Sequence, residues 1–254
     1  MLHADFPILE HDDSLPAIIE PSQTLTPIDM PEHVVLCFFP KVVAQVGAEA
    51  RVCHNLFSEL GENPIYETAV GGKRLAFVHP GVGAPFCAAV LEELIALGGR
   101  KFIACGSAGA LRSDITAGHL VIPTSAVRDE GTSYHYLPPG RDVSPSTDAV
   151  AAVETTLRKH NVPYVAGKTW TTDAIYRETP AKVARRRDEG CLVVEMECAA
   201  FFAVAQFRGV TFGQILYGGD DLSTDTWDMR DFIHGQSTLR ERLFWLAAEA
   251  CLSL

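Results

Sequence analysis

Two glutamates lie beside a long apolar stretch, where a carboxylate is costly unless it has polar partners. Glu195 and Glu197 stand in the segment Val194-Glu-Met-Glu-Cys198, which leads into the apolar residues 199–205. If 195–208 is helical, the two side chains point to different faces, so one is solvated and the other is drawn inward. A buried carboxylate needs hydroxyl or N–H donors, and a sugar diol offers two hydroxyls to one carboxylate. The alternative is a simple acidic pair at a helix start.

A second acidic pair follows the apolar segment 211–217, in Gly218-Gly-Asp-Asp-Leu-Ser-Thr224. Acids at the carboxyl end of a strand suit a ligand crevice in an α/β sheet. If burial raises its pKa, Asp220 can hold a proton and donate it to a leaving group. The alternative is a solvated turn.

Two glycine-rich segments follow predicted strands. Gly81-Val-Gly-Ala-Pro-Phe86 opens a helix, an arrangement that presents N–H groups to an anion or a polar ligand. Cys105-Gly-Ser-Ala-Gly-Ala-Leu111 is expected to be a second loop of this kind. Ser107 directly follows Gly106, so the Gly-x-Ser-x-Gly motif of a nucleophilic serine is absent, and we interpret Ser107 as a hydrogen-bonding group.

Composition excludes several classes of function. The 254 residues carry a formal charge of −11, which argues against nucleic-acid and anionic-membrane partners, and no apolar run approaches the ~20 residues of a membrane span. The seven cysteines lack Cys-x-x-Cys spacing, and no His, Cys and Asp cluster has the spacing of a metal site. We expect reduced thiols, no metal, no signal peptide and a cytoplasmic protein.

Strands alternate with helices along most of the chain, which predicts an α/β fold with a largely parallel sheet. Strands are expected at 33–39, 74–79, 101–105, 119–123, 164–168 and 211–217, and helices at 42–60, 84–97, 146–160, 180–188, 195–208 and 232–254. We expect two parts. Residues 1–32 are acidic and proline-rich, typical of an extended arm that lies on the surface or packs on a neighbouring subunit, and 33–254 form one domain.

Taken together in chain order, four motifs resemble those of the nucleoside phosphorylase and uridine phosphorylase family. They are Gly-x-Gly-x-Pro at 81–85, Gly-Ser-x-Gly-x-Leu at 106–111, Val-Glu-Met-Glu at 194–197 and Gly-Asp at 219–220. The family also includes nucleosidases that hydrolyse methylthioadenosine and adenosylhomocysteine. The resemblance implies one α/β domain around a central, mixed, partly barrel-like sheet flanked by helices. It also implies cleavage of a nucleoside's N-glycosidic bond by phosphate or by water.

The family's functional residues carry over onto matching positions in four groups. They are Asp220 as the acid that protonates the leaving base; Glu197, Met196 and Glu195 at the ribose; Lys41, Gly83, Gly106 and Ser107 at the phosphate or water site; and Thr172, Ile175, Tyr176 and Arg177 at the base. Asp220 indicates a purine, whereas the segment 127–135 resembles the uridine phosphorylase branch, so the base stays open.

This sequence departs from the phosphorylases where they bind phosphate. The first strand leads into Cys37-Phe-Phe-Pro-Lys41, which keeps Lys41 as the sole cation, and Ala104 stands where a phosphate arginine is expected. Arginine clamps are not readily replaced. We therefore expect a phosphorylase with phosphate as co-substrate and no other cofactor, a nucleosidase as the alternative, and a catalytically silent nucleoside-binding protein as a third reading. The resemblance implies a homo-oligomer, either a dimer or a hexamer.

Overall fold

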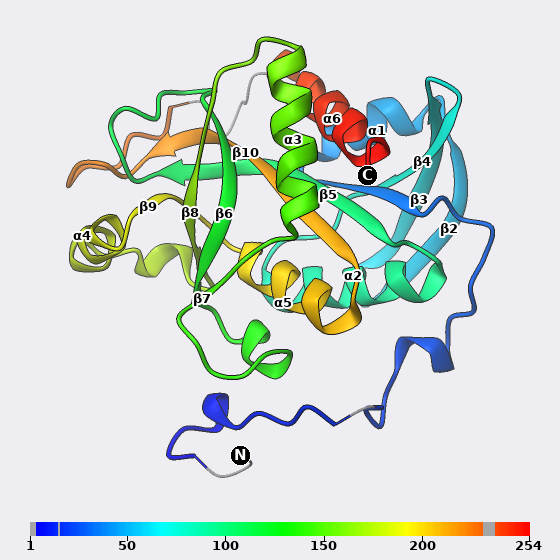
Figure 1. Ribbon diagram of the computed structural model, residues 1–254, viewed down its shortest axis with the longest axis horizontal. Coiled ribbons are helices and arrows are strands. Elements are labelled where there is room, and N and C mark those ends of the chain that lie inside the picture. Colours follow the sequence, from blue (N-terminus) through cyan, green and yellow to red (C-terminus); the bar gives the residue numbers. More distant parts are fainter. Residues whose placement is uncertain (1–3, 15, 231–236) are drawn as a thin grey trace.

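The computed structural model describes residues 4–14, 16–230 and 237–254. Within them, a mixed sheet of ten strands carries helices on both faces (Figure 1). The strands are β1 His33–Cys37, β2 Arg51–Ser58, β3 Gly61–Val70, β4 Lys73–Val78, β5 Lys101–Ala110, β6 Leu120–Asp129, β7 Asp142–Val143, β8 Tyr164–Thr172, β9 Cys191–Glu195 and β10 Thr211–Asp221. The helices are α1 Pro40–Gly47, α2 Ala84–Leu97, α3 Thr147–Lys159, α4 Pro180–Asp188, α5 Cys198–Arg208 and α6 Ser237–Leu252.

Half of the sheet closes on itself. The strand order β10-β6-β8-β9-β5 is completed by a β10–β5 pairing, which makes a barrel of these strands. The β10–β5, β6–β8 and β8–β9 pairs are parallel, and the β10–β6 and β5–β9 pairs are antiparallel. The expected α/β fold with a central, mixed, partly barrel-like sheet is therefore confirmed.

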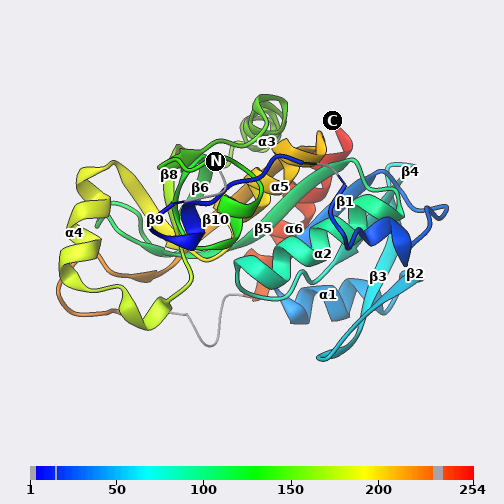
Figure 2. The same ribbon diagram turned by 90° about the horizontal axis from the view of Figure 1, so that it is seen from below.

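The other half of the sheet is open. β1 pairs in parallel with both β5 and β4, and the β4–β3 and β3–β2 pairs are antiparallel. The β2–β3 hairpin reaches one end of the molecule, and α4 lies at the other end (Figure 2). β5 therefore joins the two halves, because it closes the barrel with β10 and pairs with β1 of the open half.

Two hydrophobic cores hold the helices onto the sheet. One core contains buried residues of α2 and α5, including Phe201 and Phe202, which pack around Phe212 of β10. The other lies on the opposite side and contains buried residues of α1, α3 and α6, including Phe244, which packs on Phe77 of β4. None of the described helices is both long enough and apolar enough to cross a lipid bilayer.

The helix expected over residues 42–60 is wrong in its second half. α1 ends at Gly47, and the chain then forms β2, which pairs with β3 around a turn at Gly61, where φ is 100°. A Cβ atom at Gly47 would lie 2.8 Å from the ring of Tyr66, so the end of α1 packs closely on β3. In β2 only Leu56 is buried, so the apolar spacing seen in the sequence belongs to a largely exposed edge strand.

In two segments that were expected to be loops, the preceding strand continues. β5 runs on through Gly106 and Ser107 to Ala110, and β10 runs on through Asp220, because the two strands stay paired along their whole length. The small residues allow this close packing: a Cβ atom at Gly109 would lie 2.5 Å from the side chain of Leu222. The segment therefore forms part of a strand instead of the expected loop, and Gly109 allows the close packing of the barrel.

The helix expected from residue 195 begins later. Residues 191–195 form the unexpected strand β9, so Glu195 ends a strand and Glu197 is the N-cap residue of α5. The expected helices at 84–97 and 180–188 match α2 and α4, and that at 146–160 contains α3. The closing helix is confirmed from Ser237 onward, and residues 232–236 of that prediction lie outside the described residues.

The described residues of the segment 4–32 run along the outside of the domain (Figures 1 and 2). They contain two short 3-10 turns, Pro7–Leu9 and Pro21–Gln23. Glu20 forms an ion pair of 2.9 Å with Arg208 of α5, which also binds Glu92 of α2. This contact ties the segment to the face formed by α2 and α5.

Candidate active site

A cavity of about 250 Å³ lies beside β5, at the edge of the barrel. Its wall comes from β5, the end of β9, the start of α5, the end of β10 and the 3-10 turn Ile175–Arg177 before α4. The residues that line it are Phe38, Val82, Gly106, Ser107, Ala108, Gly109, Ile175, Glu178, Val194, Glu195, Met196, Glu197, Gln214, Asp220 and Leu222. Most of the residues that the sequence singled out therefore meet in one cavity.

Glu195 is a buried carboxylate whose oxygens are occupied by protein donors. Its Oε2 atom accepts hydrogen bonds from the main-chain N–H groups of Glu197 and Cys198, at 2.7 and 2.6 Å. Its Oε1 atom accepts from the hydroxyls of Thr171 and Thr169, at 2.6 and 3.3 Å. These bonds fix the first turn of α5 against β8. Glu195 thus positions its neighbours, whereas the sequence placed it at the ribose.

Glu197 lies at the start of α5 and lines the cavity. Its Oε1 atom accepts a hydrogen bond of 2.7 Å from the main-chain N–H of Gly83, the N-cap residue of α2. Burial raises the pKa of its carboxyl group, and the neighbouring negative charge of Glu195 raises it further. A carboxylate has about four acceptor positions, so Glu197 keeps acceptor capacity for a ligand. Met196 lines the wall beside it.

Asp220 lines the cavity from near the end of β10. A register shift between Gly218 and Asp220 marks a β-bulge, which re-aims side chains at this point of the strand. The indole N–H of Trp227 donates a 2.7 Å hydrogen bond to Asp220 Oδ2. Burial raises the pKa of Asp220, so the group retains a proton more readily than a solvated aspartate.

A second hollow of about 270 Å³ adjoins the first at Asp220. It is lined by Ile175, Tyr176, Glu178, Asp220, Leu222 and Trp227, four of which also line the first cavity. Ile175 and Tyr176, which the sequence assigned to the base, both line this hollow. Arg177 is exposed and does not line either hollow, and Thr172 is buried and accepts a bond from the N–H of Ala174 at 3.3 Å.

Glu178 is a cavity residue that the sequence offers as a further candidate to read the base, beside Arg177 and outside the four groups carried over from the family. It follows the 3-10 turn directly and lines both hollows. Burial, together with the charge of Asp220, raises the pKa of Glu178 to about 7. The available signal was an acid next to the predicted base segment, but its neighbour Arg177 suggested a solvated loop.

The predicted anion site is only partly assembled. Gly106 and Ser107 line the cavity, and Gly83 lies beside it, bound to Glu197. Lys41, in contrast, is exposed on the first turn of α1 and is not part of the cavity wall. Among the described residues that line the cavity there is no lysine, arginine or histidine.

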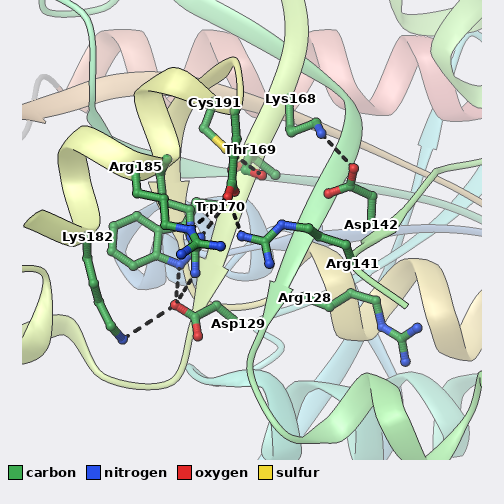
Figure 3. Close-up of polar contacts among 12 residues, drawn as sticks. Arg128, Asp129, Arg141, Asp142, Lys168, Thr169, Trp170, Lys182, Arg185 and Cys191 are labelled. Atoms are coloured by element: carbon green, nitrogen blue, oxygen red, sulfur yellow. Dashed lines mark hydrogen bonds and ion pairs between the residues drawn. The ribbon is translucent and has the colours of Figure 1, made fainter. Parts of the chain in front are cut away.

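A network of charged side chains behind the cavity holds α4 against β8 (Figure 3). Asp129 Oδ2 accepts hydrogen bonds of 3.0 Å from Trp170 Nε1 and from Arg186, whose guanidinium lies 5.3 Å from the Trp170 ring centre. β8 also carries Thr169 and Thr171, the hydroxyl donors to Glu195. The network therefore fixes the strand that supports the glutamates.

Comparison with known proteins agrees with this geometry. The model of the phosphorylase superfamily matches residues 32–250. Among curated relatives, a guanosine phosphorylase of Halorubrum lacusprofundi is 30% identical over 182 residues, covering 71% of this chain and 76% of the relative. A uridine phosphorylase of Treponema pallidum is 31% identical over 172 residues, covering 62% and 67%.

Solved structures share the fold at low sequence identity. A purine nucleoside phosphorylase from Toxoplasma gondii in complex with immucillin-H superposes with a TM-score of 0.77 at 21% identity, covering 89% of this chain and 92% of that one. An AMP nucleosidase from Bacteroides thetaiotaomicron superposes with a TM-score of 0.72 at 20% identity, covering 89% of each chain. The extent of the family match and the curated relatives show that this chain is a member of the phosphorylase superfamily, in the nucleoside phosphorylase family of enzymes.

Proposed function

We propose that the protein cleaves the N-glycosidic bond of a purine nucleoside, with phosphate as the attacking group. One observation carries the proposal: Glu197 and Asp220 line the same cavity, both buried, with different protein partners. Cleavage of this bond needs an acceptor for the sugar hydroxyls and an acid for the departing base, and this pair meets both needs.

Glu197 is the group that we place at the ribose. Its free acceptor positions take the 2′- and 3′-hydroxyl protons, while the N–H of Gly83 keeps the carboxylate in place. Each hydrogen bond to a charged acceptor contributes about 1.5–3 kcal/mol. Positive charge develops on the sugar as the bond breaks, and a fixed carboxylate stabilises that charge.

Asp220 is the group that we place at the base. In its protonated form it donates to a ring nitrogen of the purine, so the base leaves as a neutral molecule. Trp227 holds the carboxyl group through Oδ2, which leaves Oδ1 toward the ligand. Ile175 and Leu222 supply the apolar contacts for a flat ring.

The names of the curated relatives favour phosphate as the attacking group. The hydroxyl of Ser107 and the cavity edge at Gly106 are the groups that we place at the anion. A phosphate dianion also needs a cation, and we propose that a second copy of the chain brings it. Light scattering tests this part of the proposal, because a monomer that is active with phosphate would contradict it.

Water is a second candidate for the attacking group, and a specific observation favours it. Four carboxyl groups line the cavity, and no cationic side chain does so among the described residues. A dianion entering this cavity meets unfavourable charge, whereas a water molecule does not. The AMP nucleosidase neighbour shows that the same fold occurs in an enzyme named as a hydrolase of this bond.

Release of free base from nucleosides tests the proposal. The panel contains adenosine, guanosine, inosine, uridine and methylthioadenosine, each with and without inorganic phosphate. Phosphate-dependent release of a purine is the expected result, and phosphate-independent release would assign the reaction to water. Absence of release, combined with melting shifts on nucleoside addition, would identify a silent binding protein instead.

A further inference from the structure

The base end of the cavity contains a second carboxyl group besides the proposed acid. Glu178 and Asp220 both line the inner hollow of about 250 Å³ and the outer hollow of about 270 Å³. They come from different elements, because Glu178 follows the 3-10 turn Ile175–Arg177 and Asp220 ends β10. A ring that extends from the inner into the outer hollow therefore lies against the wall to which both groups belong.

Glu178 differs from the other three carboxyl groups of the cavity in its partners. Protein donors bind Glu195, Glu197 and Asp220. No donor among the described residues contacts the Glu178 carboxyl group. Burial and the charge of Asp220 are the influences that raise its pKa. Because a half-buried carboxylate is stabilised by hydrogen-bond donors, this group is the one that a ligand is best placed to satisfy.

The backbone holds Glu178 in this position. The N–H of Thr179 donates to the carbonyl of Arg177 at 2.9 Å, and the Thr179 hydroxyl accepts from the N–H of Lys182 at the start of α4. α4 is in turn fixed to β8 by Arg186 and Asp129. The side chain therefore stands on an anchored turn and not on a free loop.

We propose that Glu178 is the specificity-determining residue for the base and selects purines that carry an amino group, whose N–H donors it binds while Asp220 protonates the ring. This inference rests on the proposed function, since it assigns the base within the same cavity. Amino-bearing purines supply the donors that the protein itself does not. Glu178 stays unpaired when the edge of the base that faces it has no amino group, as in an unsubstituted purine or a base with only carbonyl acceptors there.

The test compares Glu178→Gln with the unaltered protein on adenosine, guanosine and purine riboside, which lacks the amino group. We expect kcat/KM for at least one of the amino-bearing nucleosides to fall roughly 10- to 100-fold, and kcat/KM for purine riboside to change less than about threefold. Asp188→Asn is the matched control, because Asp188 is an exposed acid at the end of α4. It should leave all three values unchanged.

Equal losses on all three substrates would overturn the proposal, as would an unchanged preference. Failure of the proposed function is distinguishable from failure of this inference. If the unaltered protein releases no base, calorimetric titration with free adenine, guanine and purine provides the readout. Tighter binding of an amino-bearing base than of purine, lost in Glu178→Gln, supports the role of Glu178 without catalysis, and equal affinities contradict it.

Discussion

The two ends of the cavity are built differently. At the end that we propose for the sugar, Glu195 and Glu197 lie at the junction of β9 and α5, and main-chain N–H groups bind both carboxyl groups. At the base end, Asp220 is held by an indole and Glu178 by no described protein donor. The first end is fixed by main-chain hydrogen bonds where β9 meets α5, and the second is formed by side chains from the end of β10 and from the turn before α4.

This difference fits the two binding tasks, because the sugar is common to all nucleosides and the base is not. Every nucleoside carries a sugar, so groups that bind the sugar gain from rigid placement before the ligand arrives. Bases differ in size and in their donors, so a wall made from side chains on turns can change without disturbing the barrel. We expect substitutions at the sugar end to affect all substrates alike, and substitutions at the base end to affect them selectively.

The largest effect on activity is expected for Asp220→Asn. An amide cannot donate an acidic proton, so purine nucleoside cleavage should fall about 10²- to 10⁴-fold. A 7-methylated purine nucleoside, whose base already carries a positive charge, should lose far less. Steady-state kinetics on guanosine and 7-methylguanosine measure the contrast, and equal losses on both would show that Asp220 is not the acid.

Glu197→Ala is expected to remove transition-state stabilisation on the order of 2–4 kcal/mol, or roughly 30- to 1000-fold in kcat/KM, for every ribonucleoside. A 2′,3′-dideoxynucleoside lacks the hydroxyls, so the unaltered protein and the variant should differ little on it. If the loss is as large on the dideoxy substrate, the carboxylate acts on something other than the sugar diol.

Glu195→Gln is expected to weaken the fold rather than select among substrates. The amide keeps one acceptor oxygen for the main-chain N–H groups of Glu197 and Cys198, but it turns N–H donors toward the hydroxyls of Thr171 and Thr169, which donate to Glu195 in the unaltered protein. This change should lower the free energy of unfolding by about 1–3 kcal/mol. Glu154→Gln is the control, because Glu154 forms a surface ion pair with Arg158 and should change stability by less than about 1 kcal/mol. Urea unfolding of both variants distinguishes a structural role of Glu195 from a role in substrate binding.

The smallest effect is a pH-dependent gain in stability in Glu178→Gln. The pKa of Glu178 is raised from 4.5 to about 7, so its stabilising contribution is present below pH 4.5 and is lost as the pH rises through about 7. At pH 8 the variant should exceed the unaltered protein by roughly 1 kcal/mol, after allowance for solvent screening. Thermal melts at pH 4.5 and 8 measure this, and a gain that is equal at both pH values would contradict it.

Local patterns predicted the helices better than the strand ends. α2 and α4 match their predicted bounds, and each has a proline in its first turn, which marks the start of the helix. β5 and β10 extend beyond prediction because their glycine-rich ends are paired with each other, and this pairing is not visible in either segment alone. β2 was missed because a largely exposed edge strand has little alternation of apolar and polar residues.

The motifs predicted which residues form the site, but not which role each of them has. Motif order brought Glu197, Ser107 and Asp220 together correctly in one cavity. It could not separate Glu195 from Glu197, because only the turn between β9 and α5 directs one toward protein donors and the other toward the cavity. Lys41 was selected for its charge, and its exposure depends on where α1 begins.

Closure of the barrel has a consequence for motion. β10 is paired with both β5 and β6, so the wall at Gly106–Gly109 cannot widen without breaking main-chain bonds. The outer hollow, lined by Tyr176 and Trp227, is then the part of the site that can adapt when a nucleoside enters. In hydrogen–deuterium exchange, the amides of β5 and β10 should exchange only with global opening, while those at 222–229 exchange more quickly and slow when a ligand is bound.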